Sequence, residues 1–196
     1  PYQITDSYGL QGMGSSGMLN KYYTLANNID ASGTSGWNSN AGFKPIGNSA
    51  DKFTGSFNGG GHTINGLFIY RPTEDEVGLF GYAEGAAVQL ANVGLTNVNV
   101  TGQKNVGGLA GYLQGEISNT YVKGSVKAEG FDAGGLVGEM KGNISNSYAT
   151  GSVNTVRGFA GGLAGSLDGG SIRSSYAAGS VGTVNSAQNN NGGLVG

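Results

Sequence analysis

Few residues in this chain could carry acid–base or metal chemistry. The 196 residues include one histidine, His62, and no cysteine. Thiolate nucleophiles, thiolate metal sites and zinc sites with two histidines are therefore excluded. A catalytic triad would depend on His62 alone, and that residue lies in the stretch "GGGHTING". Because such glycines favour a tight turn, we interpret His62 as a turn residue whose ring hydrogen-bonds neighbouring backbone.

Paired carboxylates are the other candidates, since hydrolysis of a polysaccharide needs two of them roughly 5 to 9.5 Å apart. The only dense acidic run, Glu74 to Glu76, has no counterpart one repeat later, and it is typical of a solvated loop. Other acids, such as Asp132 and Asp168, are scattered. We therefore predict no catalytic residue, no metal site and no cofactor, and hence no enzyme.

Three tyrosines have the spacing of a binding surface. Tyr121, Tyr148 and Tyr176 recur at nearly equal intervals along the chain. If Val122 and its equivalents point inward, alternation along a strand directs the tyrosines outward. Stacked, exposed rings can bind sugars through their faces, with the hydroxyls hydrogen-bonding. The same column can equally stabilise its own strands, so both interpretations stay open.

The tyrosines belong to a repeat that runs through much of the chain. Its Gly-Leu steps are nearly evenly spaced and lie at Gly78-Leu79, Gly108-Leu109, Gly135-Leu136, Gly162-Leu163 and Gly193-Leu194. Repetition with a period in the range of about 20 to 50 residues indicates a solenoid. The units are rich in Gly, Ser, Asn, Thr and Val, a composition that favours strands over helices.

We predict an all-β chain that forms a right-handed parallel β-helix, or β-solenoid, with coils of about 27–31 residues. About 28 residues at about 3.3 Å each trace a loop of roughly 90 Å, enough for three short sides. About six or seven such coils would account for the chain. We interpret residues 1–196 as one domain, with irregular lead-in coils over 1–76 and regular coils over 77–196.

Each position in such a solenoid lies over its own copy, about 4.8 Å away. The expected buried columns are Ile117, Ile144 and Ile172; Val126, Val153 and Val181; and Leu79, Leu109, Leu136, Leu163 and Leu194. Asn92, Asn119 and Asn146 form a polar column that is broken at Ser174. We expect these asparagines to be buried at a turn and to satisfy their amides along the stack, as in a cross-β ladder.

Composition limits the partners. The net charge is −2 and charged residues make up 11% of the chain, against about 25% in typical globular proteins. No basic surface is available for nucleic acid, and no apolar run approaches the roughly 20 residues that cross a bilayer. The chain begins at "PYQITDSYGL" and stops within a repeated phrase, so we expect it to be part of a longer one.

Three units, "VGGLAGYLQGEISNTYVKGSV", "AGGLVGEMKGNISNSYATGSV" and "AGGLAGSLDGGSIRSSYAAGSV", resemble the GLUG repeat. The preceding "YYTLANNIDASG" and "FTGSFNGGGHTINGLFI" resemble the lead-in often found before it. The resemblance implies that the chain comes from a bacterial surface or secreted protein. Proteins with this repeat include filamentous-haemagglutinin-like adhesins exported by two-partner secretion, and the repeat also forms non-catalytic parts of some immunoglobulin A metallopeptidases. Where the family's lead-in often has Asp, this chain has Asn58, which argues against a metal role for that turn.

The expected function is that of a structural and adhesive shaft segment in a large bacterial adhesin, extracellular or at the cell surface. Host or matrix glycans, or other copies of the chain, are the expected partners. Three alternatives stay open: a polysaccharide-active β-helix enzyme with its cleft in the first third, a non-catalytic part of an immunoglobulin A-type metallopeptidase, and a self-assembling extracellular fibre subunit.

Overall fold

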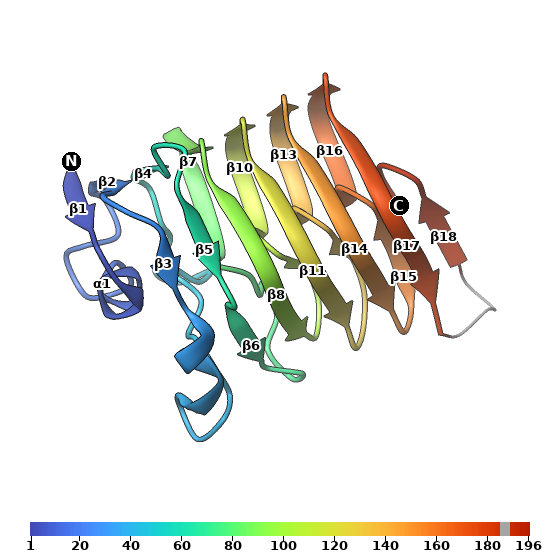
Figure 1. Ribbon diagram of the computed structural model, residues 1–196. Coiled ribbons are helices and arrows are strands. Elements are labelled where there is room, and N and C mark those ends of the chain that lie inside the picture. The colour runs from blue at the N-terminus through green and yellow to red at the C-terminus, as the bar shows by residue number, and fades with distance from the viewer. Residues whose placement is uncertain (185–188) are drawn as a thin grey trace.

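A computed structural model describes residues 1–184 and 189–196 of the chain (Figure 1). Parallel strands dominate, and two short helices lie in the N-terminal third. In chain order the elements are β1 (Tyr2–Ile4), α1 (Ser7–Gly12), β2 (Tyr22–Leu25), β3 (Ile29–Asp30), the 3-10 helix η1 (Ser32–Gly36), β4 (Ser56–Asn58), β5 (Thr63–Asn65), β6 (Phe68–Tyr70), β7 (Phe80–Ala91), β8 (Gly94–Gly102), β9 (Val106–Gly107), β10 (Ala110–Ser118), β11 (Tyr121–Ala128), β12 (Ala133–Gly134), β13 (Val137–Ser145), β14 (Tyr148–Thr155), β15 (Gly158–Gly161), β16 (Ala164–Arg173), β17 (Tyr176–Thr183) and β18 (Asn189–Gly192).

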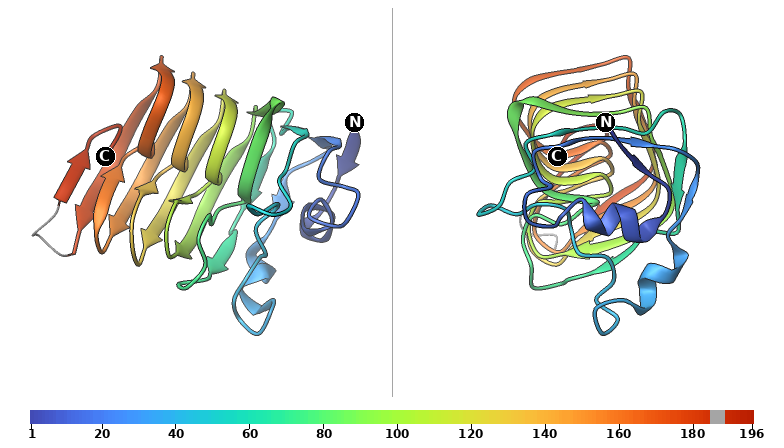
Figure 2. Two further views of the ribbon diagram at one scale, coloured as in Figure 1. Left: turned by 180° about the vertical axis from the view of Figure 1, so that it is seen from behind. Right: turned by 90° about the vertical axis from the view of Figure 1, so that its left-hand side faces the viewer.

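The strands form three parallel sheets, because each regular coil contributes one strand to each sheet. Sheet A has the order β1-β2-β4-β7-β10-β13-β16, sheet B the order β17-β14-β11-β8-β5-β3, and sheet C the order β18-β15-β12-β9. In Figure 1 the chain advances from left to right while β8, β11 and β14 run downward at the front. Seen from behind, the sheet A strands run upward (Figure 2, left). The coil is therefore right-handed, and the predicted parallel β-solenoid is confirmed.

The number of coils is smaller than predicted. The solenoid has about five turns, and not the six or seven expected. The lead-in coils are longer, since Tyr23 pairs with Phe57 and Phe57 with Leu90, whereas in the regular coils Ile117 pairs with the nearer Ile144. The lead-in consumes more chain per turn because its loops project from the coil (Figure 2, right).

The predicted isoleucine column is present. Ile117, Ile144 and Ile172 lie in register on β10, β13 and β16. Ile117 and Ile144 are buried, whereas Ile172 is only partly buried. Leu90 precedes Ile117 in the same column and Phe57 precedes Leu90, so the apolar stack continues into the lead-in.

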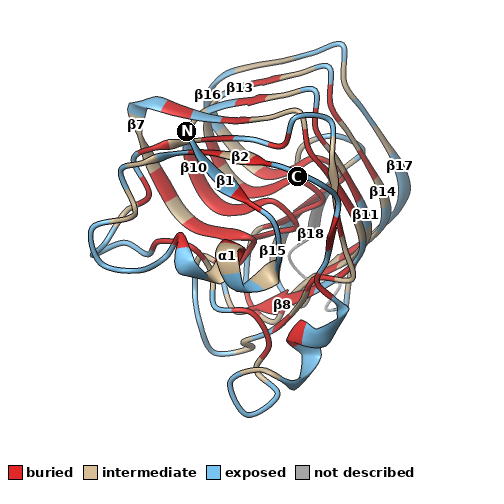
Figure 3. Cartoon of the chain, turned by 60° about the vertical axis from the view of Figure 1, so that its left-hand side comes forward, coloured by how far each residue is buried: buried red, intermediate tan, exposed pale blue. Residues whose placement is uncertain are grey.

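Burial decreases toward the last coil (Figure 3). Leu79, Leu109, Leu136 and Leu163 are fully buried, but Leu194 is 40% exposed. Val126 and Val153 are buried while Val181, in register with Val153 on β17, is only partly buried. The columns themselves are as predicted; their last members are more exposed because only one neighbouring coil packs against them.

The asparagine column differs from the prediction. Asn119 and Asn146 are exposed and Asn92 is half-buried, so this is no buried ladder. Their φ angles are 55° at Asn92, 49° at Asn119 and 48° at Asn146, and Ser174 has the same conformation at 48°. Asparagine tolerates the left-handed region better than most residues, which explains the column. Amide bonds do run along its first part: Asn119 donates to Asn92 (3.0 Å), which donates to Asn58 (3.1 Å).

Helix α1 covers the N-terminal end of the solenoid (Figure 2, right). Asp6 caps the helix by accepting a hydrogen bond from the Gly9 backbone amide at 2.7 Å. Leu10 and Met13 are fully buried and belong to the same core as the isoleucine column. The apolar interior is thus closed at this end by side chains of the helical segment.

Substitution of the central isoleucine tests the column. We expect Ile144→Asp to lower the free energy of unfolding by more than about 3 kcal/mol, because it places an unpaired charge in a fully buried apolar stack. Asn146→Ala should lower it by only about 1 kcal/mol, the cost of a left-handed alanine at an exposed corner. Chemical denaturation measures both, and the reverse ranking would contradict the assigned packing.

A glycine in the tyrosine-bearing sheet B tests the coil-to-coil spacing. At Gly151 the φ angle is +130° and a Cβ atom would lie 1.9 Å from the Gly124 carbonyl oxygen of the coil before. We expect Gly151→Ala to destabilise the chain by about 3 kcal/mol. Gly33→Ala is the matched control, since nothing lies within 4 Å of its Cβ position. Equal melting temperatures for the two variants would refute close stacking of the coils.

Candidate functional site

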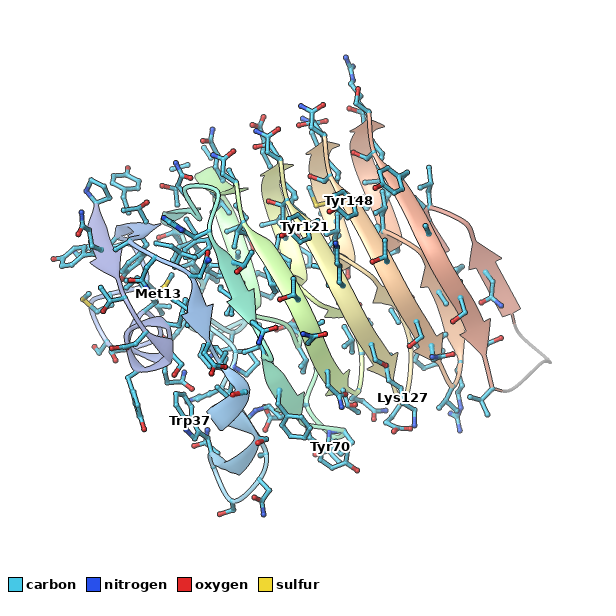
Figure 4. All side chains as sticks on the ribbon, in the orientation of Figure 1. Met13, Trp37, Tyr70, Tyr121, Lys127 and Tyr148 are labelled. Carbon is cyan, nitrogen blue, oxygen red and sulfur yellow. The ribbon has the colours of Figure 1, made fainter. Side chains whose placement is uncertain are left out.

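The three predicted tyrosines form one column on the outer side of sheet B. Tyr121, Tyr148 and Tyr176 lie in register at the starts of β11, β14 and β17. Neighbouring ring centroids are 5.0 Å apart in both pairs, with interplanar angles of 6° and 4°. Tyr121 and Tyr148 are half-buried and Tyr176 is 54% exposed. Figure 4 shows Tyr121 and Tyr148 side by side on the outer surface.

The stacking changes what the column offers to a ligand. Because the rings are nearly parallel and one strand spacing apart, each ring covers much of its neighbour's face. The column therefore does not present three open faces; it presents ring edges and a row of hydroxyls. Lys123, on the same strand as Tyr121, places its ammonium nitrogen 5.2 Å from the Tyr121 centroid and 5.8 Å from that of Tyr148.

The first ring of the column borders a hollow of about 460 Å³. Tyr121 lies directly over Gly94, where a Cβ atom would be 2.2 Å from the tyrosine Cζ. Asn58, Asn92 and Asn119, the hydrogen-bonded amides of the corner column, line the same hollow. The structure therefore joins two columns that the sequence presents separately, and it places amide donors and acceptors next to an aromatic ring.

His62 lies in the turn beside this hollow. Its backbone amide donates to the Gly59 carbonyl at 2.9 Å, and its carbonyl accepts from the Gly94 amide at 3.1 Å. Within the described residues the imidazole makes no hydrogen bond, so the expected bond from ring to backbone is not present. His62 therefore stabilises the turn through its backbone amide and carbonyl, and not through its ring.

The acidic run has two parts. Glu74 and Asp75 are exposed, and Glu74 pairs with Arg71 at 2.8 Å, as a loop would allow. Glu76 differs, because it is half-buried with a φ of 60°. Burial, together with the neighbouring Asp75 charge, raises the pKa of its carboxyl group. The interpretation of the whole run as a solvated loop is wrong for Glu76.

Glu76 begins a corner cluster that was not predicted from the sequence. Asn105 and Asp132 occupy the equivalent left-handed corners of the next two coils, with φ angles of 52° and 59°. Asn105 is only 5% exposed and its amide nitrogen donates to Glu139 at 2.9 Å. Among the described residues, one side-chain oxygen of Asn105 and one of Asp132 are buried without a hydrogen-bond partner. Burial raises the pKa of Asp132 against the opposing charge of Lys104.

A signal for this cluster exists in the sequence, although it is not a repeated residue type. The three corners directly precede the pairs Val77-Gly78, Val106-Gly107 and Ala133-Gly134. Their occupants, Glu, Asn and Asp, all combine a left-handed turn with a polar side chain. Aligning by turn conformation would find the column, whereas aligning by residue type does not.

Sheet A carries a second aromatic pair that sequence reasoning missed. Tyr82 and Tyr112 lie in register, with ring centroids 4.2 Å apart and an interplanar angle of 16°. Burial raises the pKa of Tyr82, and its hydrogen bond with Glu84 adds to the effect. Ion pairs flank the rings, Lys52 with Glu84 at 2.8 Å and Lys141 with Asp168 at 3.2 Å. With only two members, this pair lacks the periodicity that marks the column on sheet B.

In residues 1–184 and 189–196, no cluster of three or more His, Asp or Glu side chains is arranged to hold a metal ion. Over the same residues, no helix is long and apolar enough to cross a membrane. The polar groups that do converge are tyrosine hydroxyls, amides and isolated carboxylates. Such groups bind uncharged polar ligands through hydrogen bonds.

The corner cluster makes stability depend on pH. A carboxyl group whose folded-state pKa lies above its usual value of 3.8 binds more protons in the folded chain, so stability falls as pH rises from about 4 through the raised pKa. We expect Asp132→Asn to raise the melting temperature at pH 7 and to flatten this fall, because asparagine suits the left-handed corner without a charge. Thermal melts from pH 4 to 8 measure this. Parallel curves for the two proteins would contradict it.

The architecture defines a class, the right-handed parallel β-solenoids. Within it, a family model described as "The GLUG motif" matches residues 102–127 and 129–154. Each match runs from the end of one sheet B strand through sheets C and A to the next sheet B strand, so one motif is one coil. Residues 102–127 and 129–154 are therefore two GLUG motifs, and the resemblance seen in the sequence is confirmed there.

Two curated proteins resemble parts of the chain. Halomucin of Haloquadratum walsbyi is 38% identical over 130 residues, which cover 64% of this chain and 1% of halomucin. A protein of Evansella cellulosilytica named as a Gly-rich membrane protein is 38% identical over 85 residues, which cover 42% of this chain and 10% of that protein. The chain thus spans a small fraction of the length of these relatives.

A solved structure from Bacteroides ovatus shares the fold. It is that of a protein assigned by name to the immunoglobulin A1 proteases, and it aligns with a TM-score of 0.70 at 23% identity. The alignment covers 100% of this chain and 71% of that one. At this identity the similarity shows a common architecture and nothing about activity.

Proposed function

We propose that the chain is an adhesive shaft segment of a large surface-exposed or secreted protein, and that it acts without catalysis. The observation that carries this proposal is the in-register stacking of equivalent residues, such as Ile117 on Ile144 and Tyr121 on Tyr148, through successive coils. A coil that pairs with its own copy can be added repeatedly to extend a rigid rod. This is how a protein separates binding regions from a cell without flexible linkers.

The relatives support a position outside the cell. One is named halomucin and the other is named as a membrane protein, and the chain matches only 1% and 10% of their lengths. A short solenoid that corresponds to a small part of a very long protein fits a segment within a larger surface structure. We extend the extracellular location and the shaft role to this chain on that basis.

Adhesion would occur at the first ring of the tyrosine column. Tyr121 supplies a ring edge and a hydroxyl, and the amides of Asn92 and Asn119 line the adjoining hollow. These groups match the hydroxyls of a glycan, while Lys123 beside the rings adds a cation for acidic sugars. Because one copy of the site makes few contacts, it binds a glycan weakly. Display of many copies along a surface raises the overall avidity.

A glycan array tests the adhesive role with the chain displayed on multivalent particles. We expect Tyr121→Ala to lower bound signal by about fivefold or more, because it removes the ring that borders the amide hollow. Tyr22→Ala is the control, since Tyr22 is 57% exposed on β2, away from the column. Equal signal from both variants, or self-association in place of glycan binding, would contradict adhesion through this column.

A further inference from the structure

A second concave region lies at the N-terminal end, between α1 and the loop over residues 37–51. It is a cleft of about 830 Å³, within the range of about 300–1,000 Å³ that is typical of small-molecule sites. Its walls include Tyr8, Trp37, Asn38, Lys44, Asn48 and Asp51. Figure 4 places Trp37 far from Tyr121 and Tyr148, so the cleft and the tyrosine column are separate surfaces.

One wall of the cleft carries two aromatic rings, Tyr8 and Trp37, and a third ring, Phe43, packs behind Trp37. Phe43 is fully buried, Trp37 is half-buried and Tyr8 is 74% exposed. The Tyr8 and Trp37 centroids are 4.9 Å apart at 32°, and those of Trp37 and Phe43 are 6.4 Å apart at 25°. Phe43 therefore fixes the aromatic cluster to the core. The Tyr8 ring lies mostly in solvent, so it adds little buried apolar area to the fold. Such a ring is an aromatic surface available to a ligand.

The two walls are joined by specific hydrogen bonds. The Gln11 side chain of α1 donates to the Lys44 carbonyl and accepts from the Lys44 amide, both at 2.9 Å. The Asn38 amide nitrogen donates to the Gly42 carbonyl at 2.7 Å, and Asn48 accepts from the Asp51 amide at 2.8 Å. Because the helix and the loop are held in place before a ligand arrives, binding orders few groups and costs little entropy.

The backbone beside Trp37 is strained. Asn38, Ser39 and Asn40 have φ angles of 51°, 57° and 69°, three consecutive residues in the left-handed region. Asparagine tolerates this region better than most residues, so Ser39 bears most of the cost of the turn. Strain of this kind persists where surrounding contacts over-determine it, and it concentrates at ligand-binding sites. The turn ends at the Gly42 amide, which donates to the Trp37 carbonyl at 3.0 Å and so closes the loop behind the ring.

Hydrogen-bond donors and hydrogen-bond acceptors both surround the rings of Tyr8 and Trp37. In the part of the chain that the structure describes, the Lys44 ammonium, the Asp51 carboxylate and the Asn48 amide nitrogen make no side-chain hydrogen bond to protein. The two charges are opposite in sign, so the cleft favours no net charge in its ligand. An aromatic face next to uncommitted donors and acceptors is complementary to a pyranose ring, which has a C–H face and a rim of hydroxyls.

We propose that this cleft binds a short neutral oligosaccharide of two or three pyranose rings, with one ring packed on the exposed ring of Tyr8 beside Trp37. The hydroxyls of the bound sugar reach Lys44, Asn48 and Asp51. This site goes beyond the shaft role and does not depend on the tyrosine column, since it uses different residues at the other end of the solenoid.

The chain provides its own reporter, because Trp37 is the only tryptophan in 196 residues. We expect its fluorescence to change saturably when cellobiose, lactose or N,N′-diacetylchitobiose is titrated into the protein, with at least one of the three binding. Tyr8→Ala should weaken the apparent affinity for that disaccharide by about tenfold or more. Since Tyr8 is 74% exposed, this variant should keep the parent melting temperature.

Two control variants separate this site from other surfaces. Tyr22→Ala removes another exposed ring outside the cleft, and Tyr148→Ala breaks the tyrosine column; neither should change the fluorescence titration. Absence of any change with all three neutral disaccharides would overturn the proposal, as would unchanged binding in a folded Tyr8→Ala protein. A response confined to digalacturonic acid would also overturn it, because the ligand would then be an anion at Lys44. If Tyr121→Ala loses binding on the glycan array but keeps the Trp37 fluorescence titration, the result bears on the tyrosine column alone and leaves the cleft proposal standing.

Discussion

The parallel hydrogen-bond ladder between successive coils is the constraint on which the whole structure depends. It sets each residue about 4.8 Å from its equivalent in the next coil, so Ile117 must pack on Ile144 and Tyr121 on Tyr148. Glycines follow from the same spacing, because at Gly151 a side chain would meet the backbone of the coil before. A residue therefore fits this fold when it is compatible with a copy of itself.

The corners show how one backbone requirement serves different chemistry. Asn119 and Asp132 both adopt left-handed turns. Asn119 faces solvent and links its amide to the coil before, whereas Asp132 lies in a half-buried corner near Glu139, where partial burial raises its pKa. The conformation selects small polar residues, and the surroundings then decide whether the side chain is an ordinary surface group or a perturbed one.

Regular and irregular coils support different kinds of surface. In the regular coils, equivalent side chains form straight columns, so the tyrosines make a strip of edges and hydroxyls that suits many weak contacts. The lead-in keeps this register in its short strands, where Phe57 pairs with Leu90, but its helix and loops project from the coil. There, segments distant in the sequence enclose a cleft, with Tyr8 and Trp37 brought together at 4.9 Å. A single solenoid can therefore combine a repetitive outer face with a concave site at one end.

The sequence by itself determined the strand class, the period and the apolar columns, because self-stacking requires the same residue type at a fixed spacing, and that regularity is visible in one dimension. It also identified the tyrosine column, though not that the rings cover one another's faces. Only the tertiary structure decided that Asn119 is exposed, that Glu76, Asn105 and Asp132 share a corner, and that Tyr8 meets Trp37. These relations join unlike residues through turn geometry and loop packing, and no repeated residue type marks them in the chain.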